Sequence, residues 1–130
     1  METMFSTVVA LVLVEGGIQE SERLYLETLA ARWKLTNDDA ARLIKEAHLR
    51  GARTTVPRDP ILGRKLLGAL VEAALADGAV APKERLFVAR IAAAMNVEPA
   101  TLEATFAEAT KSAGNHQRFG SRTTRNPPPS

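Results

Sequence analysis

The sequence contains no cysteine among its 130 residues. This absence excludes disulfides, thiolate zinc sites, iron–sulfur clusters and cysteine nucleophiles, and it fits a reducing, cytoplasmic setting. A long apolar run is missing as well. The most apolar stretch, residues 4–14, is too short to cross a bilayer, and it follows Glu2 where a signal peptide would carry basic residues. We therefore expect it to be a buried helix of a globular protein.

Catalytic machinery is also missing from the sequence. No segment shows the alternation of a strand, and no glycine-rich phosphate loop follows one. The two histidines, His48 and His116, have neither a second ligand at a metal-binding spacing nor a nucleophile close by in the sequence. We expect His48, near a helix C-terminus, to interact with the helix dipole. The chain is predicted not to be an enzyme.

The positive net charge of +2 comes from the C-terminal tail. Residues 111–130 carry four basic residues and no acid, so the first 110 residues hold 13 basic and 15 acidic groups, a net charge of −2. The tail is rich in Gly, Asn, Thr and Pro and has no apolar period with which to pack. We expect a folded domain over residues 1–112 and a disordered basic, proline-rich tail over residues 113–130.

The chain contains an internal duplication. Residues 15–47 align without gaps on residues 77–109 at an offset of 62, and eight of the 33 pairs are identical. The apolar residues 4–14 extend the match upstream against residues 66–76. The identical pairs are Gly16/Gly78, Glu22/Glu84, Arg23/Arg85, Leu24/Leu86, Ala30/Ala92, Ala31/Ala93, Glu46/Glu108 and Ala47/Ala109.

Capping signals divide each copy into three helices. Asp59 with Pro60 opens a helix, Gly78 ends it, and Thr36 is the N-cap of another. The fold class is thus all-α, a compact bundle of about six helices built from two pseudo-symmetric three-helix repeats, at about residues 4–50 and 60–112. The expected helices span residues 4–15, 19–33, 37–50, 60–76, 82–95 and 99–112. Trp33, equivalent to Met95, is expected in the core.

An acidic turn joins the first two helices of each repeat. The octets are "EGGIQESE" at 15–22 and "DGAVAPKE" at 77–84, and each puts one carboxylate before glycine and another seven residues later. Reversal of the chain at glycine brings the two acids near each other, and clustered carboxylates attract hard divalent cations such as calcium or magnesium, with zinc a third candidate. An EF-hand does not fit, because its first ligand positions would be leucine or alanine. The candidate metal ligands are Asp77, Glu84, Glu15 and Glu22.

The segment "ALADGAVAPKERLFVARIAAAMNV" and its first-half copy resemble the signature of the TerB-like tellurite-resistance family. The resemblance covers about residues 4–110. It implies a duplicated helical module of tellurite-resistance and related stress systems, with acids proposed to bind metal and with protein partners that include membrane-associated ones. A similar domain occurs in some membrane-anchored DnaJ-type co-chaperones. By position the motif acids are Asp77 and Glu84, matched by Glu22. Glu15 replaces the usual aspartate, which favours the second turn over the first.

Two alternatives remain open at this stage. Glu84 stands at the third position of its helix, where a glutamate commonly bonds the backbone N–H of the N-cap, and Asp77 would then only solvate a turn. The module would in that case be a scaffold or co-chaperone-type interaction domain whose acids are structural. Basic residues around the linker favour nucleic-acid binding less strongly, because such a cluster is usually a solvated loop. They are His48, Arg50, Arg53, Arg58, Arg64 and Lys65.

Overall fold

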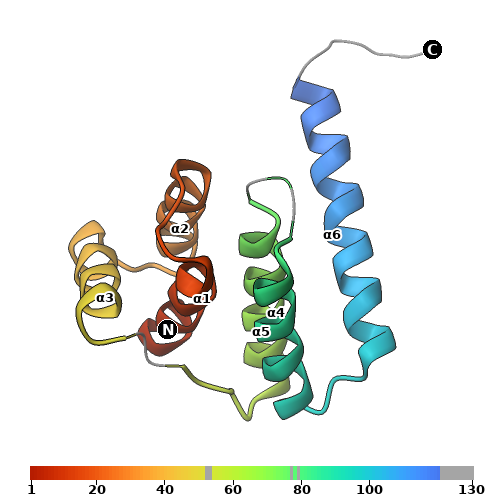
Figure 1. Cartoon of the computed structure of the whole chain (residues 1–130), viewed down its shortest axis with the longest axis horizontal. Coiled ribbons are helices and arrows are strands. Elements are labelled where there is room, and N and C mark those ends of the chain that lie inside the picture. Colours follow the sequence, from red (N-terminus) through yellow and green to blue (C-terminus); the bar gives the residue numbers. More distant parts are fainter. Residues whose placement is uncertain (52–53, 77, 79, 121–130) are drawn as a thin grey trace.

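The computed structural model describes residues 1–51, 54–76, 78 and 80–120, with side chains up to residue 111 except that of Glu15. Over these residues the chain is all-helical and contains no strand (Figure 1). The elements are α1 (Glu2–Val12), the 3-10 turn η1 (Leu13–Glu15), α2 (Glu20–Arg32), α3 (Asn37–Arg50), α4 (Pro60–Ala74), α5 (Pro82–Ala94) and α6 (Pro99–Gly120). The six predicted helices are confirmed.

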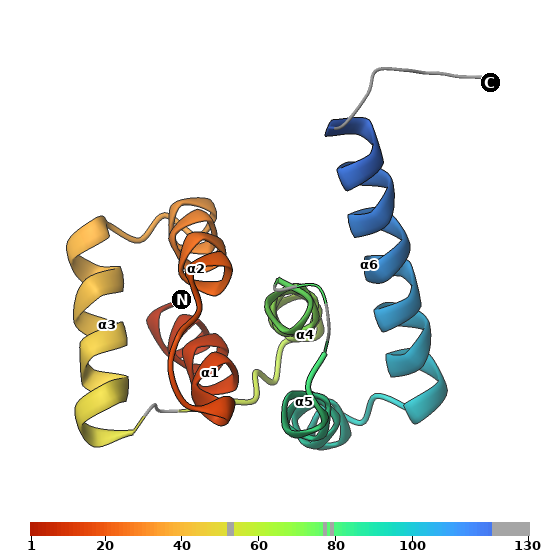
Figure 2. The ribbon, with the colours of Figure 1, turned by 45° about the horizontal axis from the view of Figure 1, so that its top comes forward.

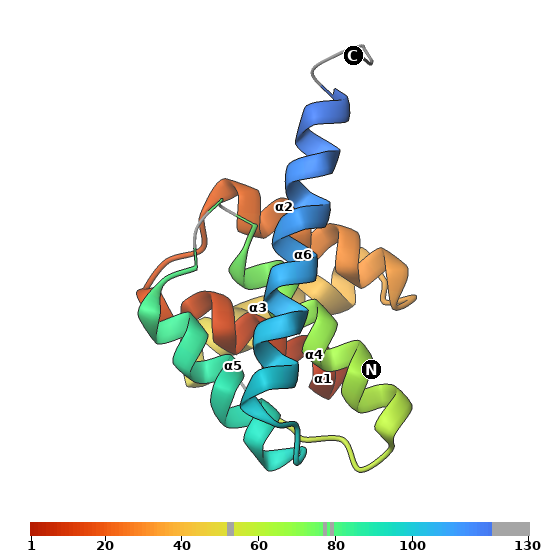
Figure 3. The same cartoon turned by 90° about the vertical axis from the view of Figure 1, so that its right-hand side faces the viewer.

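Helix α6 is longer than the sequence predicted. It continues past residue 112 to Gly120, through the first part of the predicted disordered tail, and it projects beyond the other helices (Figure 3). The lone Gly114 lowers helix propensity without ending a helix, and no proline occurs between Pro99, the first residue of α6, and Pro127. The segment lacks an apolar period, but it contains no residue that ends a helix, so α6 continues through it. Residues 121–130 lie outside the described part of the chain.

Helices α1 and α4 form the centre of the bundle. Helices α2 and α3 lie on the α1 side, and α5 and α6 lie on the α4 side (Figure 2). Helix α1 contacts α2, α3 and α5, while α4 contacts α5, α6 and α2. A helix covered by so many neighbours must be apolar on nearly all faces. This explains the composition of α1, which the sequence had predicted to be buried.

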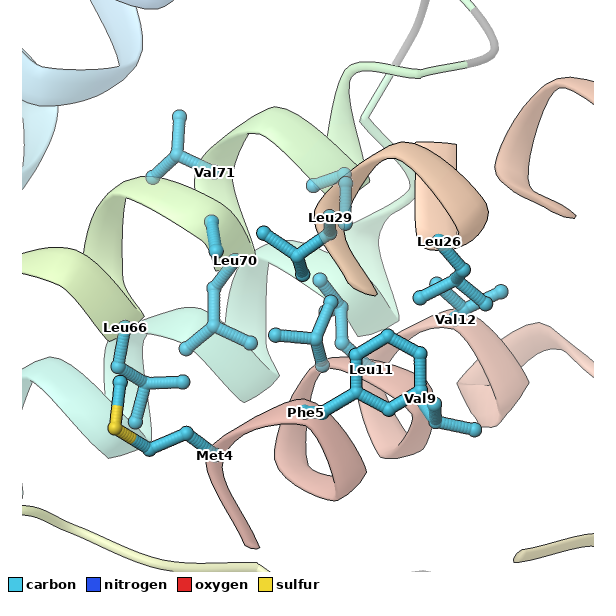
Figure 4. Packing of buried hydrophobic residues seen from close by; sticks show 14 of the residues in the cluster. Met4, Phe5, Val9, Leu11, Val12, Leu26, Leu29, Leu66, Leu70 and Val71 are labelled. Carbon is cyan, nitrogen blue, oxygen red and sulfur yellow. The ribbon is translucent and has the colours of Figure 1, made fainter. Parts of the chain in front are cut away.

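The core joins the two central helices. Phe5 and Leu11 on α1 and Leu66 and Leu70 on α4 are all fully buried, and they meet side chains from α2 in the middle of the molecule (Figure 4). Trp33, just after α2, is only 7% exposed, which confirms its predicted place in the core. Burial of this apolar surface is the main force that holds the two sides of the bundle together.

The ends of α2 and α5 have the same backbone conformation. Lys34 and Asn96, 62 residues apart, both adopt a left-handed conformation, with φ of 63° and 62°. The backbone N–H groups of Leu35 and Val97 each donate to the carbonyl five residues earlier, at 2.8 and 2.9 Å. These are Schellman caps, in which an apolar residue follows the left-handed one and packs back on the helix. The two helices therefore stop by the same local mechanism.

Candidate functional site

The second acid of each turn caps a helix. The backbone N–H of Gln19 donates to Glu22 Oε1 at 2.8 Å, and that of Ala81 donates to Glu84 Oε1 at 3.2 Å. Both glutamates are buried, with 4% and 2% of their surface exposed. Each also lies in the first turn of its helix, where the helix dipole favours a negative charge. The capping role predicted for Glu84 is confirmed, and Glu22 has the same role.

The side chain of the first acid of each turn lies outside the described part of the structure. Asp77 lies outside the described residues, as does the side chain of Glu15, so neither can be placed relative to Glu84 or Glu22. In the part of the chain that the structure describes, no group of three or more histidine, aspartate or glutamate side chains is arranged to hold a metal ion. A cation site made of Asp77, Glu84, Glu15 and Glu22 stays a prediction.

Removing the charge of Glu22 is expected to weaken the fold by about 1 kcal/mol. In Glu22→Gln the amide oxygen still accepts the bond from Gln19, but the charge-assisted bond and the dipole interaction are lost. Glu108→Gln is the matched control, because Glu108 is exposed on α6 and forms no ion pair with other described residues. Urea denaturation measures both. Equal losses in the two variants would contradict the capping role.

A variant of the second turn separates capping from cation binding. If a divalent cation binds at these turns, millimolar calcium, magnesium or zinc raises the melting temperature of the wild-type protein, because a ligand that binds only the folded state stabilises it. The double variant Asp77→Asn with Glu84→Gln would lose that rise. An equal response of both proteins would remove the metal hypothesis and leave the cap.

A groove of about 690 Å³ opens between α2 and α3. Ile18, Ala40 and Ile44 contribute its apolar lining, and Leu49, at the end of α3, extends the apolar surface with 71% of its area exposed. Charged side chains stand along the rim of the groove. They are Arg23 and Glu27 on α2 and Lys45 on α3, and His48 on α3 adds an imidazole to the lining.

The aligned position between α5 and α6 carries a larger side chain. Phe106 stands where the first half has Ile44, and it is only 3% exposed. The guanidinium of Arg85 lies over its ring at 4.3 Å from the ring centre and pairs across the helices with Glu103, Nη1 to Oε2, at 2.6 Å. A cation held over an aromatic face and bridged to the facing helix covers this position.

The first half cannot make this closure. Ala41 replaces Glu103 at the aligned position, so Arg23, the counterpart of Arg85, pairs instead with Glu20 and Glu27 on its own helix. Ile44, which lines the groove, is a smaller side chain than Phe106 at the aligned position. The sequence held both signals in the aligned pairs 41/103 and 44/106. Neither pair predicts a groove without knowledge of how the helices pack, because substitutions of this kind are common between repeats.

The basic cluster around the linker does not form one surface. His48 lines the groove between α2 and α3, whereas Arg50 faces a hollow between α1 and α3. Arg64 and Lys65 lie on α4, next to Arg32 of α2, and Arg58, which precedes α4, lines a further hollow with Arg64. Arg53 lies outside the described residues. The predicted cluster is therefore divided among several parts of the molecule. Arg64 and Lys65 are the members that line a hollow together with a cation from another helix, Arg32.

A polar contact fixes α2 against α4. The Tyr25 hydroxyl donates to Glu72 Oε1 at 2.6 Å, and Arg32 Nη1 donates to the same oxygen at 3.2 Å. Burial and the bond to Glu72 raise the pKa of Tyr25, so the phenol stays a donor. Phe87 occupies the aligned position in the second half and offers no such bond.

No protein-family model, no curated protein and no solved structure matches this chain. The resemblance to TerB-like proteins therefore depends on the sequence pattern alone. Within the described residues, no helix combines the length and the apolar character needed to span a membrane.

Proposed function

We propose that this protein is a non-enzymatic protein-interaction module of the TerB-like type, and that the groove between α2 and α3 binds an amphipathic helix of a partner protein. One observation carries the proposal. Two aligned positions of the chain differ, and the difference leaves an apolar groove open in one half while Phe106, Arg85 and Glu103 cover its counterpart. An exposed apolar surface of this kind is expected to serve binding.

The duplication is part of the same proposal. Matching helix ends, matching glutamate caps and matching helix contacts at an offset of 62 support two three-helix repeats of common origin. Once one repeat had closed its outer groove, the other was free to change for a ligand. The asymmetry is thus what a shared scaffold with one binding site would produce.

Charge along the rim indicates the chemistry of the partner. Arg23 is already paired, but Lys45 forms no ion pair with other described residues. A helix that buries apolar side chains against Ile44 and Leu49 would meet Lys45 along its edge toward α3. Acidic residues on that side of an apolar face complement this charge. The partner segment is therefore expected to be an acidic amphipathic helix.

Selection of a displayed peptide library for binding to the full-length protein tests the groove. Selected peptides are expected to carry apolar residues at helical spacing, such as i, i+3 or i+4, and i+7, flanked by Asp or Glu. The variant Ala41→Glu with Ile44→Phe copies the closed half, and we expect it to bind the selected peptides at least about ten-fold more weakly, a difference of about 1.4 kcal/mol. Fluorescence anisotropy of labelled peptides measures the change.

Ala104→Glu is the matched control, because it adds one carboxylate to an exposed position of α6 away from the groove. It is expected to leave peptide affinity unchanged. Enrichment of basic peptides, or equal binding to the wild type and to the closed variant, would overturn the proposal. Thermal denaturation of the closed variant confirms that it folds, since the introduced pair repeats one that the second half already contains.

A further inference from the structure

A second hollow, of about 220 Å³, lies between the end of α2 and the outer face of α4. Gly68 and Trp33 contribute to its lining, and three cationic side chains stand around it. They are Arg32 from α2 and Arg64 and Lys65 from α4. The hollow is distinct from the groove between α2 and α3, with which it shares no lining residue.

The charges around this hollow are not balanced. Glu72 is the one carboxylate among its lining residues, and it already accepts hydrogen bonds from Tyr25 and Arg32. Arg64 and Lys65 form no ion pair with other described residues. Two cations are thus left without a counter-charge beside a small concave surface. Such an arrangement attracts a compact anion.

Gly68 keeps the hollow open. It lies inside α4, and a Cβ atom built there would meet nothing within 4 Å. Close packing therefore does not require glycine, although glycine inside a helix lowers its stability relative to alanine. A residue that weakens a helix without a packing reason is expected where function needs the space. Any side chain at position 68 would project into the hollow and fill part of it.

We propose that this hollow binds the phosphate group of a small phosphorylated molecule. Arg32 and Arg64 offer planar guanidinium groups that match phosphate oxygens, and Lys65 adds a point charge. The volume of about 220 Å³ is below that of ordinary drug-sized pockets and suits a phosphate group with little else attached. The site extends beyond the proposed docking function, because a protein helix would use the other side of α2.

Trp33 is the single tryptophan of the chain and lines the hollow, so its fluorescence reports on binding there. The full-length protein is titrated with inorganic phosphate and, separately, with glycerol 3-phosphate, at constant ionic strength set with chloride. A saturable change with half-saturation at or below about 1 mM is expected. Tighter binding of glycerol 3-phosphate identifies a phosphomonoester as the ligand class, and tighter binding of inorganic phosphate identifies the free ion.

Substitutions locate the binding to this hollow. Arg64→Gln with Lys65→Gln is expected to weaken phosphate binding at least about ten-fold, whereas Lys83→Gln with Arg90→Gln removes the same charge from exposed positions of α5 and leaves it unchanged. Gly68→Leu fills the space and weakens binding to the same degree. Gly68→Ala is expected to raise the melting temperature while it weakens binding, which separates lost affinity from lost folding.

Three results would overturn the phosphate site. The first is a change in fluorescence that never saturates or that chloride reproduces. The second is equal loss of affinity in the α5 control and in the α4 variant, which would mean a response to net charge. The third is tighter binding of duplex DNA than of either small anion, displaced by neither. None of these results depends on whether a peptide binds between α2 and α3, so the two proposals stand or fall separately.

Discussion

Leu70→Ala is expected to lower the free energy of unfolding by about 2–5 kcal/mol. Leu70 is fully buried in the contact between α4 and α1, where the two sides of the bundle meet. Removal of its side chain loses the transfer free energy of the missing methyl groups and leaves a cavity that rigid helices cannot close. Domains of this size are stabilised by only about 5–15 kcal/mol in total. Urea denaturation followed by circular dichroism measures the loss.

Leu49→Ala makes the matched comparison, because the same atoms are removed from a side chain that is 71% exposed. Its free energy of unfolding is expected to change by no more than about 0.5 kcal/mol. The affinity for the peptides selected on the groove should fall, since Leu49 extends its apolar surface. Leu70→Ala and Leu49→Ala therefore separate stability from binding. Comparable losses of stability in both would contradict the burial that the structure shows.

Gly16→Ala is expected to cost about 1–3 kcal/mol. Gly16 has φ of 117° and ψ of −107°, a conformation that residues with a side chain rarely adopt. A Cβ atom at Gly16 would meet nothing within 4 Å, so the whole cost is expected to come from the backbone. Chemical denaturation measures it. The aligned Gly78, with φ of 96°, is expected to respond in the same way.

The neighbouring glycine provides the control for this prediction. Gly17 does not have a positive φ, and a Cβ atom there would also meet nothing within 4 Å. Gly17→Ala is expected to be neutral or to stabilise by about 0.4–1 kcal/mol, because alanine restricts the unfolded chain. If Gly16→Ala proved as harmless as Gly17→Ala, the chain reversal at the acidic turn would not depend on the glycine conformation.

Several helices were predictable because they carry their own start signals. Asp59 accepts a bond from the backbone N–H of Ile61 at 2.9 Å, and Thr36 accepts one from Asp39 at 3.0 Å, as the capping rules require. Hydrogen bonding to the side chain and the backbone of Thr36 lowers the pKa of Asp39. Such bonds span two or three residues, so the sequence contains all of the information that fixes them.

The proposed binding surfaces were not predictable in the same way. The groove depends on whether Arg23 can reach a carboxylate on a neighbouring helix, and the phosphate hollow depends on Arg32 and Arg64 meeting from different helices. These distances are set by the packing of helices that are far apart in the sequence. The acids of the turns, in contrast, stood out in the sequence because of their regular spacing. Glu22 and Glu84 cap their own helices, and this capping role accounts for their regular spacing as well as a metal site would.

Helix α2 lines both proposed binding sites, since it borders the groove toward α3 and the hollow toward α4. Tyr25 and Arg32 connect α2 to α4, because both donate hydrogen bonds to the carboxylate of Glu72. An occupant on one side that shifts α2 would therefore change the shape that the other side presents. Thermodynamic linkage makes such an effect symmetrical: whatever factor the anion exerts on peptide affinity, the peptide must exert on anion affinity.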